Sequence, residues 1–139
     1  MQIPIVRSVL AVIFSVAVAL GLFMVVEGVS ANLHPWPADF GGTFEEVARQ
    51  VESYPAWVLA LLGGVGYGAI MLICTFIATR LGHNRNPWHG YGVGAFLFAV
   101  VVANMAMLPY PIWFWVLMFA VLPSAGYLGT KRAAENRPT

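Results

Sequence analysis

The fold is decided by one uncharged run near the C-terminus, Gly90–Thr130, which reads GYGVGAFLFAVVVANMAMLPYPIWFWVLMFAVLPSAGYLGT. A helix needs about 20 apolar residues to cross the hydrocarbon core of a bilayer, so this run is long enough for two crossings. Its middle carries Pro109-Tyr110-Pro111, and each proline removes a backbone donor and disfavours the α conformation of the preceding residue. The sequence therefore predicts two spanning helices, approximately residues 89–108 and 111–130, that form a tight hairpin.

The rest of the chain carries two more apolar segments of spanning length, approximately residues 5–28 and 55–79. Of all 139 residues, 60% are hydrophobic and 9% are charged, whereas an ordinary soluble domain has about 45–50% and about 25%. This composition leaves no room for a separate catalytic domain. We therefore expect an all-α membrane protein, a four-transmembrane-helix bundle that forms one domain over residues 1–132 and is followed by a polar tail, residues 133–139.

The basic residues indicate how the helices are oriented. Loops on the cytoplasmic side of a membrane protein carry an excess of lysine and arginine. The loop between the first two predicted spans, residues 30–54, holds Arg49 beside four acidic residues, and the other six basic residues lie on the opposite side: Arg7, Arg80, Arg85, Lys131, Arg132 and Arg137. We therefore predict that both termini are cytoplasmic and that the loop 30–54 is outside.

A cleaved signal peptide is the alternative interpretation of the first apolar segment. Arg7 precedes this segment, and Val29-Ser30-Ala31 has the small residues of a cleavage site. The hydrophobic core of a signal peptide has about 7–15 residues. The uncharged stretch Ser8–Val26 is longer than that, which favours a spanning helix.

The outer loop contains the signature of a helix start. Thr43 is followed three residues later by Glu46, and at this capping-box spacing each side chain accepts a hydrogen bond from the backbone of the other residue. Apolar residues then recur at helical spacing: Phe44, Val47, Ala48 and Val51. We expect a short amphipathic helix of about ten residues that ends near Tyr54-Pro55 and serves either as a structural lid over the helix ends or as a binding surface.

Small residues indicate where the spanning helices approach closely. Lipid supplies no hydrophobic drive between helices, so close contact depends on residues that let the backbones approach. The expected helix-packing glycines are Gly64 with Gly68 and Gly90 with Gly94. Longer stripes of small residues follow both helices, Ala60, Gly64, Gly68, Thr75 and Ala78 on one and Gly92, Ala95, Ala99, Ala103 and Ala106 on the other. These stripes pack either within the chain or against a second copy or partner.

Three polar residues form the candidate binding site. Glu27 is a carboxylate contiguous with the first apolar span, and charged groups at membrane depth are costly and usually paired or functional. Asn104 lies about one turn below the outer end of the third span, and His34 follows the first span beside two prolines, so both can reach Glu27. The cluster of Glu27, His34 and Asn104 is therefore either a structural clasp or a site for protons, ions or lipid headgroups.

Other classes of site are not expected. The basic residues form no stripe that could follow a nucleic-acid backbone, so no nucleic-acid partner is predicted. His83 and His89 lie across the bilayer from His34 with no carboxylate or cysteine beside them, so neither a metal site nor another cofactor is expected. Gly64–Gly68 resembles a potassium-channel filter. Only about half a bilayer of chain separates it from the next basic loop, too little for the full-length span that follows a filter, so no channel filter is expected. The single Cys74 lies in an apolar run and is interpreted as a small buried residue.

Several motifs carry a family resemblance: Glu27, His34-Pro35-Trp36-Pro37, Gly42-Thr43-Phe44-Glu45-Glu46, Tyr54-Pro55-Ala56-Trp57, His89-Gly90, Asn104-Met105 and Met107-Leu108-Pro109-Tyr110-Pro111-Ile112-Trp113-Phe114. In these residues the chain resembles a family of small bacterial four-helix integral membrane proteins that carries no assigned activity. The resemblance covers nearly the whole chain. It implies a multi-pass protein of the bacterial inner membrane whose outer loop is periplasmic, and it assigns no catalytic residue.

The expected function is binding or assembly, with the working surface at the periplasmic end of the bundle. The expected partners are the lipid bilayer and either another membrane protein or a second copy of the chain. One alternative is a small oligomeric transporter or channel, although the polar residues within the spans, Ser15, Tyr67 and Thr75, are typical of ordinary helices. Another is a lipid-active membrane enzyme that uses Glu27 as general base with His34 beside it.

Overall fold

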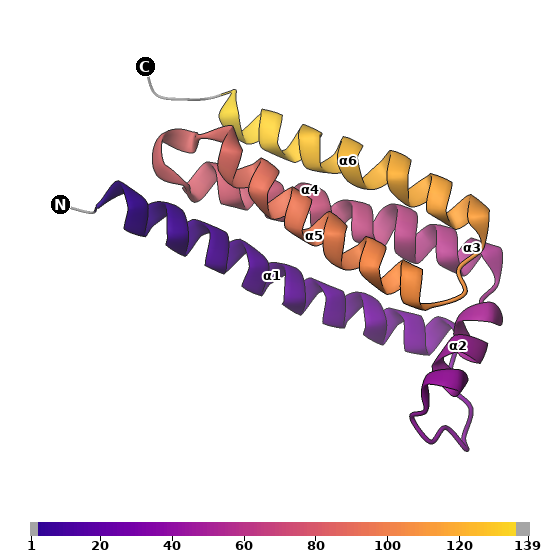
Figure 1. Ribbon diagram of the computed structural model, residues 1–139. Helices are drawn as coiled ribbons and strands as arrows, with labels where there is room; N and C mark the ends of the chain where they lie inside the picture. The colour runs from indigo at the N-terminus through magenta and orange to yellow at the C-terminus, as the bar shows by residue number, and fades with distance from the viewer. Residues whose placement is uncertain (1–2, 136–139) are drawn as a thin grey trace.

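The computed structural model describes residues 3–135 and is all-α, as the sequence predicts (Figure 1). Four helical stretches are long and apolar enough to cross a membrane, and the second of them runs without interruption through α3, η1 and α4. The bounds are α1 Pro4–Leu33, α2 Phe44–Glu52, α3 Ala56–Leu59, η1 Ala60–Tyr67, α4 Gly68–Leu81, η2 His83–Arg85, α5 Pro87–Met107 and α6 Ile112–Ala134. The four-helix membrane bundle with a short helix between its first two spans is therefore confirmed.

The first span is longer than predicted at its outer end. It continues to Leu33, past the expected boundary of the span 5–28. It ends where His34 leaves the helical conformation, with φ −142° and ψ 81°, because the following Pro35 disfavours the α conformation of the residue before it.

The last helix also continues further than expected. It runs through Ala134 and so includes the start of the predicted polar tail 133–139. Ala133 is fully buried, which shows that this part of the chain packs on the bundle. Residues 136–139 of the predicted tail lie outside the described residues.

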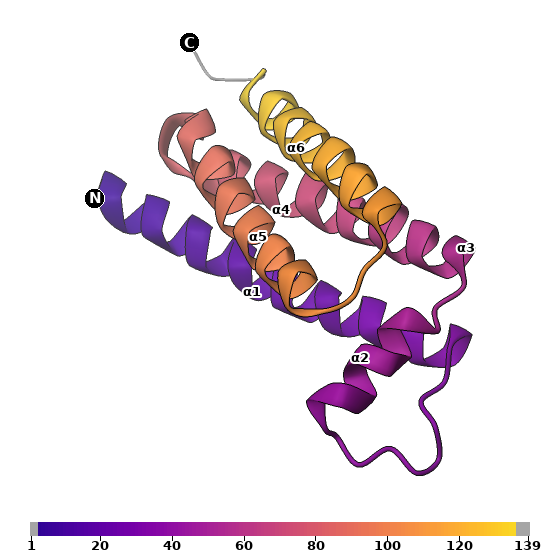
Figure 2. The ribbon, with the colours of Figure 1, turned by 45° about the vertical axis from the view of Figure 1, so that its right-hand side comes forward.

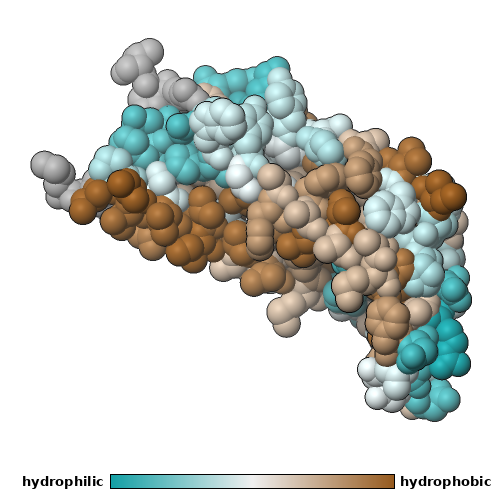
Figure 3. Space-filling view, viewed as in Figure 1, coloured by the Kyte–Doolittle hydropathy of each residue, from teal (hydrophilic) through white to brown (hydrophobic). Residues whose placement is uncertain are grey.

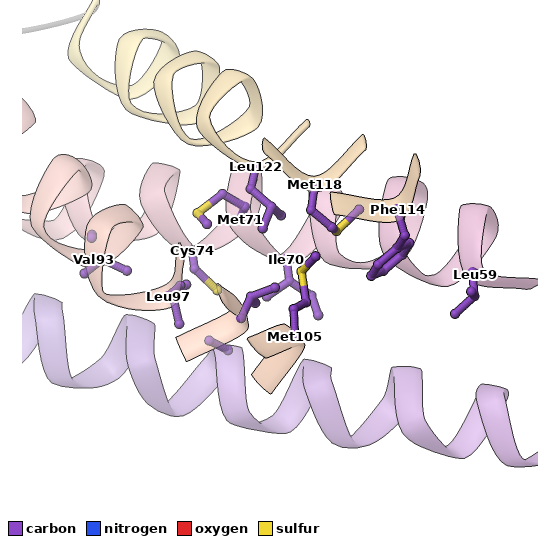
Figure 4. Packing of buried hydrophobic residues seen from close by; sticks show 13 residues of the cluster. Leu59, Ile70, Met71, Cys74, Val93, Leu97, Met105, Phe114, Met118 and Leu122 are labelled. Carbon is purple, nitrogen blue, oxygen red and sulfur yellow. The ribbon is translucent and has the colours of Figure 1, made fainter. Parts of the chain in front are cut away.

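The four spans lie side by side, with both chain termini at one end of the bundle and α2 at the other (Figures 1 and 2). The central helix is α4, which contacts α1, α5 and α6. Figure 4 shows how apolar side chains from the spans meet in one cluster, whose labelled members are Leu59, Ile70, Met71, Cys74, Val93, Leu97, Met105, Phe114, Met118 and Leu122. The core therefore lies around α4.

Charge is separated along the bundle. The end with the termini, called the basic end below, carries Arg7, Arg80, Arg85, Lys131 and Arg132, whereas the α2 end carries five of the six acidic residues of the chain. Figure 3 shows hydrophilic side chains gathered near the termini and over α2, with hydrophobic side chains along α1 between them. At the basic end, Arg7 Nε donates a hydrogen bond of 2.9 Å to the Leu81 carbonyl oxygen, which ties α1 to the last turn of α4.

A small-residue seam that the sequence analysis did not identify holds α1 against the bundle. Ala11, Ser15 and Ala19 recur every four residues, and all three are buried. Ser15 donates its hydroxyl to the Ala11 carbonyl oxygen of its own helix, so no polar group of this seam needs a partner across the interface. The seam lets α1 approach its neighbours although most of its large side chains face outward.

Close helix contact also occurs at glycines, though not at every predicted one. A Cβ atom at Gly68 would lie 2.9 Å from Val121 Cγ1, and one at Gly90 would overlap the hydroxyls of Thr79 and Thr130. At Gly64 the nearest neighbour is Leu117 Cδ2 at 3.8 Å, and at Gly94 it is Thr75 Cγ2 at 3.2 Å. The contact at Gly94 is therefore tight, whereas that at Gly64 is an ordinary van der Waals contact. Close approaches that were not predicted lie at Gly63, Gly82 and Gly129.

The predicted small-residue stripe on the third span does not pack within the chain. All of its members are exposed, and the buried face of α5 carries larger residues: Val93, Leu97, Val101 and Met105. Lipid is as apolar as leucine, so small and large apolar residues can both face it. The stripe therefore did not indicate the inward face of the helix. An apolar pattern alone therefore cannot distinguish a lipid-facing side from a buried one.

The capping box at the start of α2 is present as predicted. Thr43 Oγ1 accepts a hydrogen bond of 3.3 Å from the Glu46 backbone N–H, and Glu46 Oε2 accepts hydrogen bonds from the backbone N–H groups of Thr43, 3.0 Å, and Gly41, 2.9 Å. The backbone donor of Thr43 is the largest cause that holds the pKa of the Glu46 carboxyl below its ordinary value of 4.5.

This shift predicts that the start of α2 loosens in acid. A carboxyl group with a lowered pKa in the folded state stabilises that state above its unfolded pKa, and the contribution disappears as pH falls through the folded pKa. We expect the amides of Gly41 and Thr43 to lose protection from hydrogen exchange as pH falls through the lowered folded-state pKa of Glu46. Glu46→Gln should remove this pH dependence, whereas Glu45→Gln, at an exposed position beside it, should keep it. Equal protection of these amides at about pH 6 and about pH 3 in the unmodified protein would contradict the assignment.

Candidate functional site

The second span contains an eight-residue π-helix, η1, between α3 and α4. π-helical turns are rare, hold more than four residues and occur frequently at functional sites. The segment is rich in glycine, with Gly63, Gly64 and Gly66, and so lacks the side chains that would crowd a widened turn. It includes most of the segment that resembles a channel filter. Because this backbone is helical, its carbonyl groups are not arranged as an ion filter.

A partly open cavity of about 350 Å³ lies beside η1 at the α2 end of the bundle. Every spanning helix and α2 contribute to its wall: Phe23, Val26, Glu27, Ser30, Trp36, Val47, Gln50, Val51, Tyr54, Leu59, Leu62, Gly63, Tyr67, Val100, Val101, Asn104, Leu108, Tyr110 and Phe114. The exposed lining residues Glu27, Val100 and Asn104 place its opening between α1 and α5, next to Trp36 of the outer loop. In a bilayer this opening faces lipid near the membrane boundary.

Aromatic side chains make up much of the wall. Phe23 and Tyr67 pack edge to face, with ring centroids 5.2 Å apart, and Tyr110 stacks on Phe114 at 4.9 Å. Trp36 packs on Phe40 of the outer loop at 4.3 Å, and so the loop also presents an aromatic ring to the cavity. The wall is therefore apolar and presents several ring faces to an occupant.

Polar groups of the cavity are few, and several of them are paired with one another. The Tyr67 hydroxyl donates a hydrogen bond of 3.2 Å to Glu27 Oε1, which joins η1 to α1. The Ser30 and Tyr54 hydroxyls form a second hydrogen bond of 2.5 Å between α1 and the segment that precedes α3. Burial, and then the negative charge of Glu27, raise the pKa of the Tyr110 hydroxyl to about 12. Tyr67 therefore contacts the Glu27 carboxylate directly, and Tyr54 and Tyr110 line the same cavity.

Glu27 lies at the boundary of the hydrocarbon core. Arg7 marks the basic end of α1, and the helix between Arg7 and Glu27 is about 30 Å long at 1.5 Å per residue. This distance matches the thickness of the hydrocarbon core. A ligand held at Glu27 would therefore have its polar group at headgroup depth and its apolar part among the tails.

Of the three residues of the predicted site, the structure places two in this cavity. Glu27 and Asn104 line it from α1 and α5. His34 is not one of the lining residues, because its Nε2 lies 2.7 Å from Ser53 Oγ and its ring packs on Tyr54 with centroids 4.6 Å apart. The imidazole therefore supports the outer wall through Tyr54.

The short helix α2 covers the outer end of the cavity. Val47, Gln50 and Val51 line it from this helix. The buried Gln50 side chain donates hydrogen bonds of 3.1 Å and 3.3 Å to the carbonyl oxygens of His34 and Pro35, which fixes α2 to the end of α1. The helix α2 therefore forms part of the cavity wall, and whether it serves as a lid or as a binding surface stays a prediction.

Three residues that line the cavity, Tyr67, Tyr54 and Ser30, are not among the site residues predicted from the sequence. Tyr67 was interpreted as an ordinary helix residue, and yet it is the hydrogen-bond donor to Glu27. One signal was available in the sequence: a tyrosine that follows several glycines in the outer half of a span, opposite a lone carboxylate in another span. The register that brings these two residues together depends on η1, whose π conformation no sequence pattern indicated.

Comparisons with protein-family models, with curated proteins and with solved structures give no match for this chain. Four long apolar helices support a small multi-pass membrane protein and identify no family. The resemblance to small bacterial four-helix proteins therefore remains an expectation from the sequence.

Proposed function

We propose that this chain is a membrane-embedded binding protein whose cavity at the α2 end takes an amphipathic ligand from the surrounding lipid leaflet. The observation that carries the proposal is the cavity itself, with apolar walls from all four spans and a few polar groups among them. Its size falls within the range of small-molecule sites, about 300–1,000 Å³. Sites of that kind use apolar walls for affinity and a small number of polar groups for orientation.

The opening toward lipid supports an amphipathic ligand. An occupant would enter between α1 and α5 without leaving the membrane, and its polar group would meet Glu27, Tyr67 and Asn104. The hydrogen bonds that join α1 to η1 and to Tyr54 hold this wall in place, so the site is largely preformed.

The proposal is tested by closing the cavity. We expect saturable quenching of tryptophan fluorescence by 8-bromo-1-octanol in maltoside micelles, because Trp36 lines the cavity. Val100→Phe, which places a larger side chain in the opening, should weaken the saturable part about tenfold or more. The matched control is Ala99→Phe, at an exposed neighbouring position that does not line the cavity. Identical saturation curves for the unmodified protein and both variants would contradict the proposal.

We infer from the charge separation that the protein sits in a bacterial inner membrane with its basic end in the cytoplasm and α2 in the periplasm. The excess of arginine and lysine at the basic end supports this orientation. The ligand would then come from the periplasmic leaflet.

Cysteine labelling tests the orientation. Glu45 and Glu135 are exposed glutamates at opposite ends of the bundle, and the native Cys74 is fully buried. In intact cells, an impermeant thiol reagent should label Glu45→Cys and leave Glu135→Cys and the unmodified protein unlabelled. After the membrane is opened, both variants should react. Labelling of Glu135→Cys from outside, with none of Glu45→Cys, would mean that the bundle is inverted.

A further inference from the structure

The cavity carries one charge. Among its lining residues, Glu27 is the single acidic side chain, and no lysine, arginine or histidine lines the cavity. The nearest basic candidates lie elsewhere: His34 packs on Tyr54 and Ser53, and Arg49 is exposed on α2. Within residues 3–135 the Glu27 carboxylate forms no ion pair, and its hydrogen bond comes from the neutral Tyr67 hydroxyl.

We propose that the ligand of this cavity is an organic ammonium ion with an apolar chain, whose cationic group lies beside Glu27 among the tyrosine rings. This inference rests on the proposed binding function and specifies the chemistry of the ligand. The cationic group would supply the opposite charge that no side chain of the cavity provides for Glu27.

The aromatic wall favours an organic cation. Ammonium groups, above all substituted ones, bind to the faces of tyrosine, tryptophan and phenylalanine through the negative potential of the ring. Tyr54, Tyr67 and Tyr110 contribute such rings to the cavity that Glu27 lines, and Trp36 contributes another from the outer loop. Two of the tyrosine hydroxyls are already engaged, Tyr67 with Glu27 and Tyr54 with Ser30, so these rings are held in position.

The same residues disfavour other charged ligands. An anion would meet the Glu27 carboxylate with no cationic side chain to offset it. A calcium ion takes six to eight oxygen ligands, and magnesium needs near-ideal octahedral geometry. The described residues contain no group of three His, Cys, Asp or Glu side chains that could hold a metal ion. A large, weakly hydrated organic cation fits one carboxylate and several rings better than a metal ion does.

The ammonium group can come from two sources: the headgroup of a phospholipid, or a free amphipathic amine dissolved in the leaflet. Both offer a cation at headgroup depth and an apolar chain. The opening between α1 and α5 admits either of them from the side.

A matched pair of brominated probes tests the inference in the unmodified protein. 8-Bromooctyltrimethylammonium and 8-bromo-1-octanol share their chain and differ in charge, and both quench tryptophan. We expect the cation to saturate the quenching at a concentration at least about tenfold lower than the alcohol does. This comparison needs no variant. Equal saturation of both probes, each sensitive to Val100→Phe, would overturn the cation inference and leave the binding function standing. The absence of any saturable quenching would overturn both.

Variants locate the effect at Glu27. Glu27→Gln keeps the shape of the side chain and its ability to accept from Tyr67 but removes the charge, so it should weaken cation binding about tenfold and leave the alcohol unchanged. The matched control, Glu52→Gln, removes a charge from an exposed glutamate of α2 that does not line the cavity, and it should change neither probe. An unchanged cation affinity in a folded Glu27→Gln protein would overturn the inference.

Lipids distinguish the two sources. Phosphatidylethanolamine carries an ammonium group, whereas phosphatidylglycerol does not. If a lipid headgroup is the ligand, micelles doped with phosphatidylethanolamine should compete with the brominated cation for the unmodified protein, and micelles doped with phosphatidylglycerol should not. If a free amine is the ligand, neither lipid should compete, while octyltrimethylammonium should displace the probe. Stronger competition by phosphatidylglycerol than by octyltrimethylammonium would show a preference for anions and would contradict the inference.

Discussion

Gly129→Ala is expected to destabilise the bundle strongly, although it adds a single methyl group. A Cβ atom at Gly129 would overlap the carbonyl oxygen of Leu72 and the hydroxyl of Thr75, and it would lie 3.1 Å from the Leu72 carbonyl carbon. A backbone group of the central helix cannot move aside like the end of a flexible side chain, so α6 must shift from α4. Overpacking of this kind costs about 1–3 kcal/mol and occasionally more. The measurement is the thermal unfolding midpoint in detergent.

A glycine on the lipid-facing side provides the control. A Cβ atom at Gly92 would have no neighbour within 4 Å, and alanine is favoured over glycine inside a helix by about 1 kcal/mol. Gly92→Ala should therefore leave the unfolding midpoint unchanged or raise it. If Gly129→Ala and Gly92→Ala shift the midpoint alike, α4 and α6 do not approach as closely as the structure shows.

Ala19→Leu is expected to separate α1 from the rest of the bundle. Ala19 is fully buried in the core cluster and is the last residue of the seam through which α1 docks. Three additional carbon atoms have no room there, and α1 buries a smaller share of its residues than the other spans do. Stability in detergent should fall by about 1–3 kcal/mol or more. Because α1 forms one wall of the cavity, saturable binding of both brominated probes should fall with it.

The matched control is Ala17→Leu, two residues away on the exposed side of the same helix. This variant adds the same group to the lipid-facing surface, where lipid accommodates it, so stability and probe binding should stay unchanged. Loss of stability in both variants would mean that a larger side chain destabilises the protein at either position of α1. Loss in neither would mean that the seam does not hold α1.

The positions of the spans could be predicted from the sequence because their causes are local. Pro109 follows the end of α5, and Pro111 precedes the start of α6. The length of each apolar segment determines where a helix crosses the membrane, and Thr43 with Glu46 starts the helix in the loop. Each of these signals acts within a few residues of its effect. The ends of α1 and α6 were less well placed, since both helices continue through residues that no longer need to lie in lipid.

The inward faces of the helices could not be predicted in the same way. In water, a helix shows its buried side by the contrast of apolar and polar residues, whereas a spanning helix is apolar all round. The alanine stripe of α5 and the seam of α1 are both rows of small residues, and the structure exposes the first and buries the second. Which row is buried depends on the complete arrangement of four helices.

The residues of the candidate site also differ in whether the sequence alone indicates them. Glu27 stood out because a carboxylate in an apolar helix is costly, and Asn104 could be placed at the same depth by counting residues from Pro109. Tyr67 carries no such signal, since a tyrosine is ordinary at many positions in a membrane helix. Its contact with Glu27 depends on the π-helical register of η1, which belongs to tertiary structure.

The separation of charge between the two ends also determines how the molecule responds to an energised membrane. Across a potential of about 100 mV, moving one elementary charge costs about 2.3 kcal/mol. If the cytoplasm is negative, turning the bundle over would carry the basic end outward and the acidic α2 end inward, and both movements run against the field. The field therefore favours the same insertion as the loop charges do, and a de-energised cell loses part of the force that orients this chain.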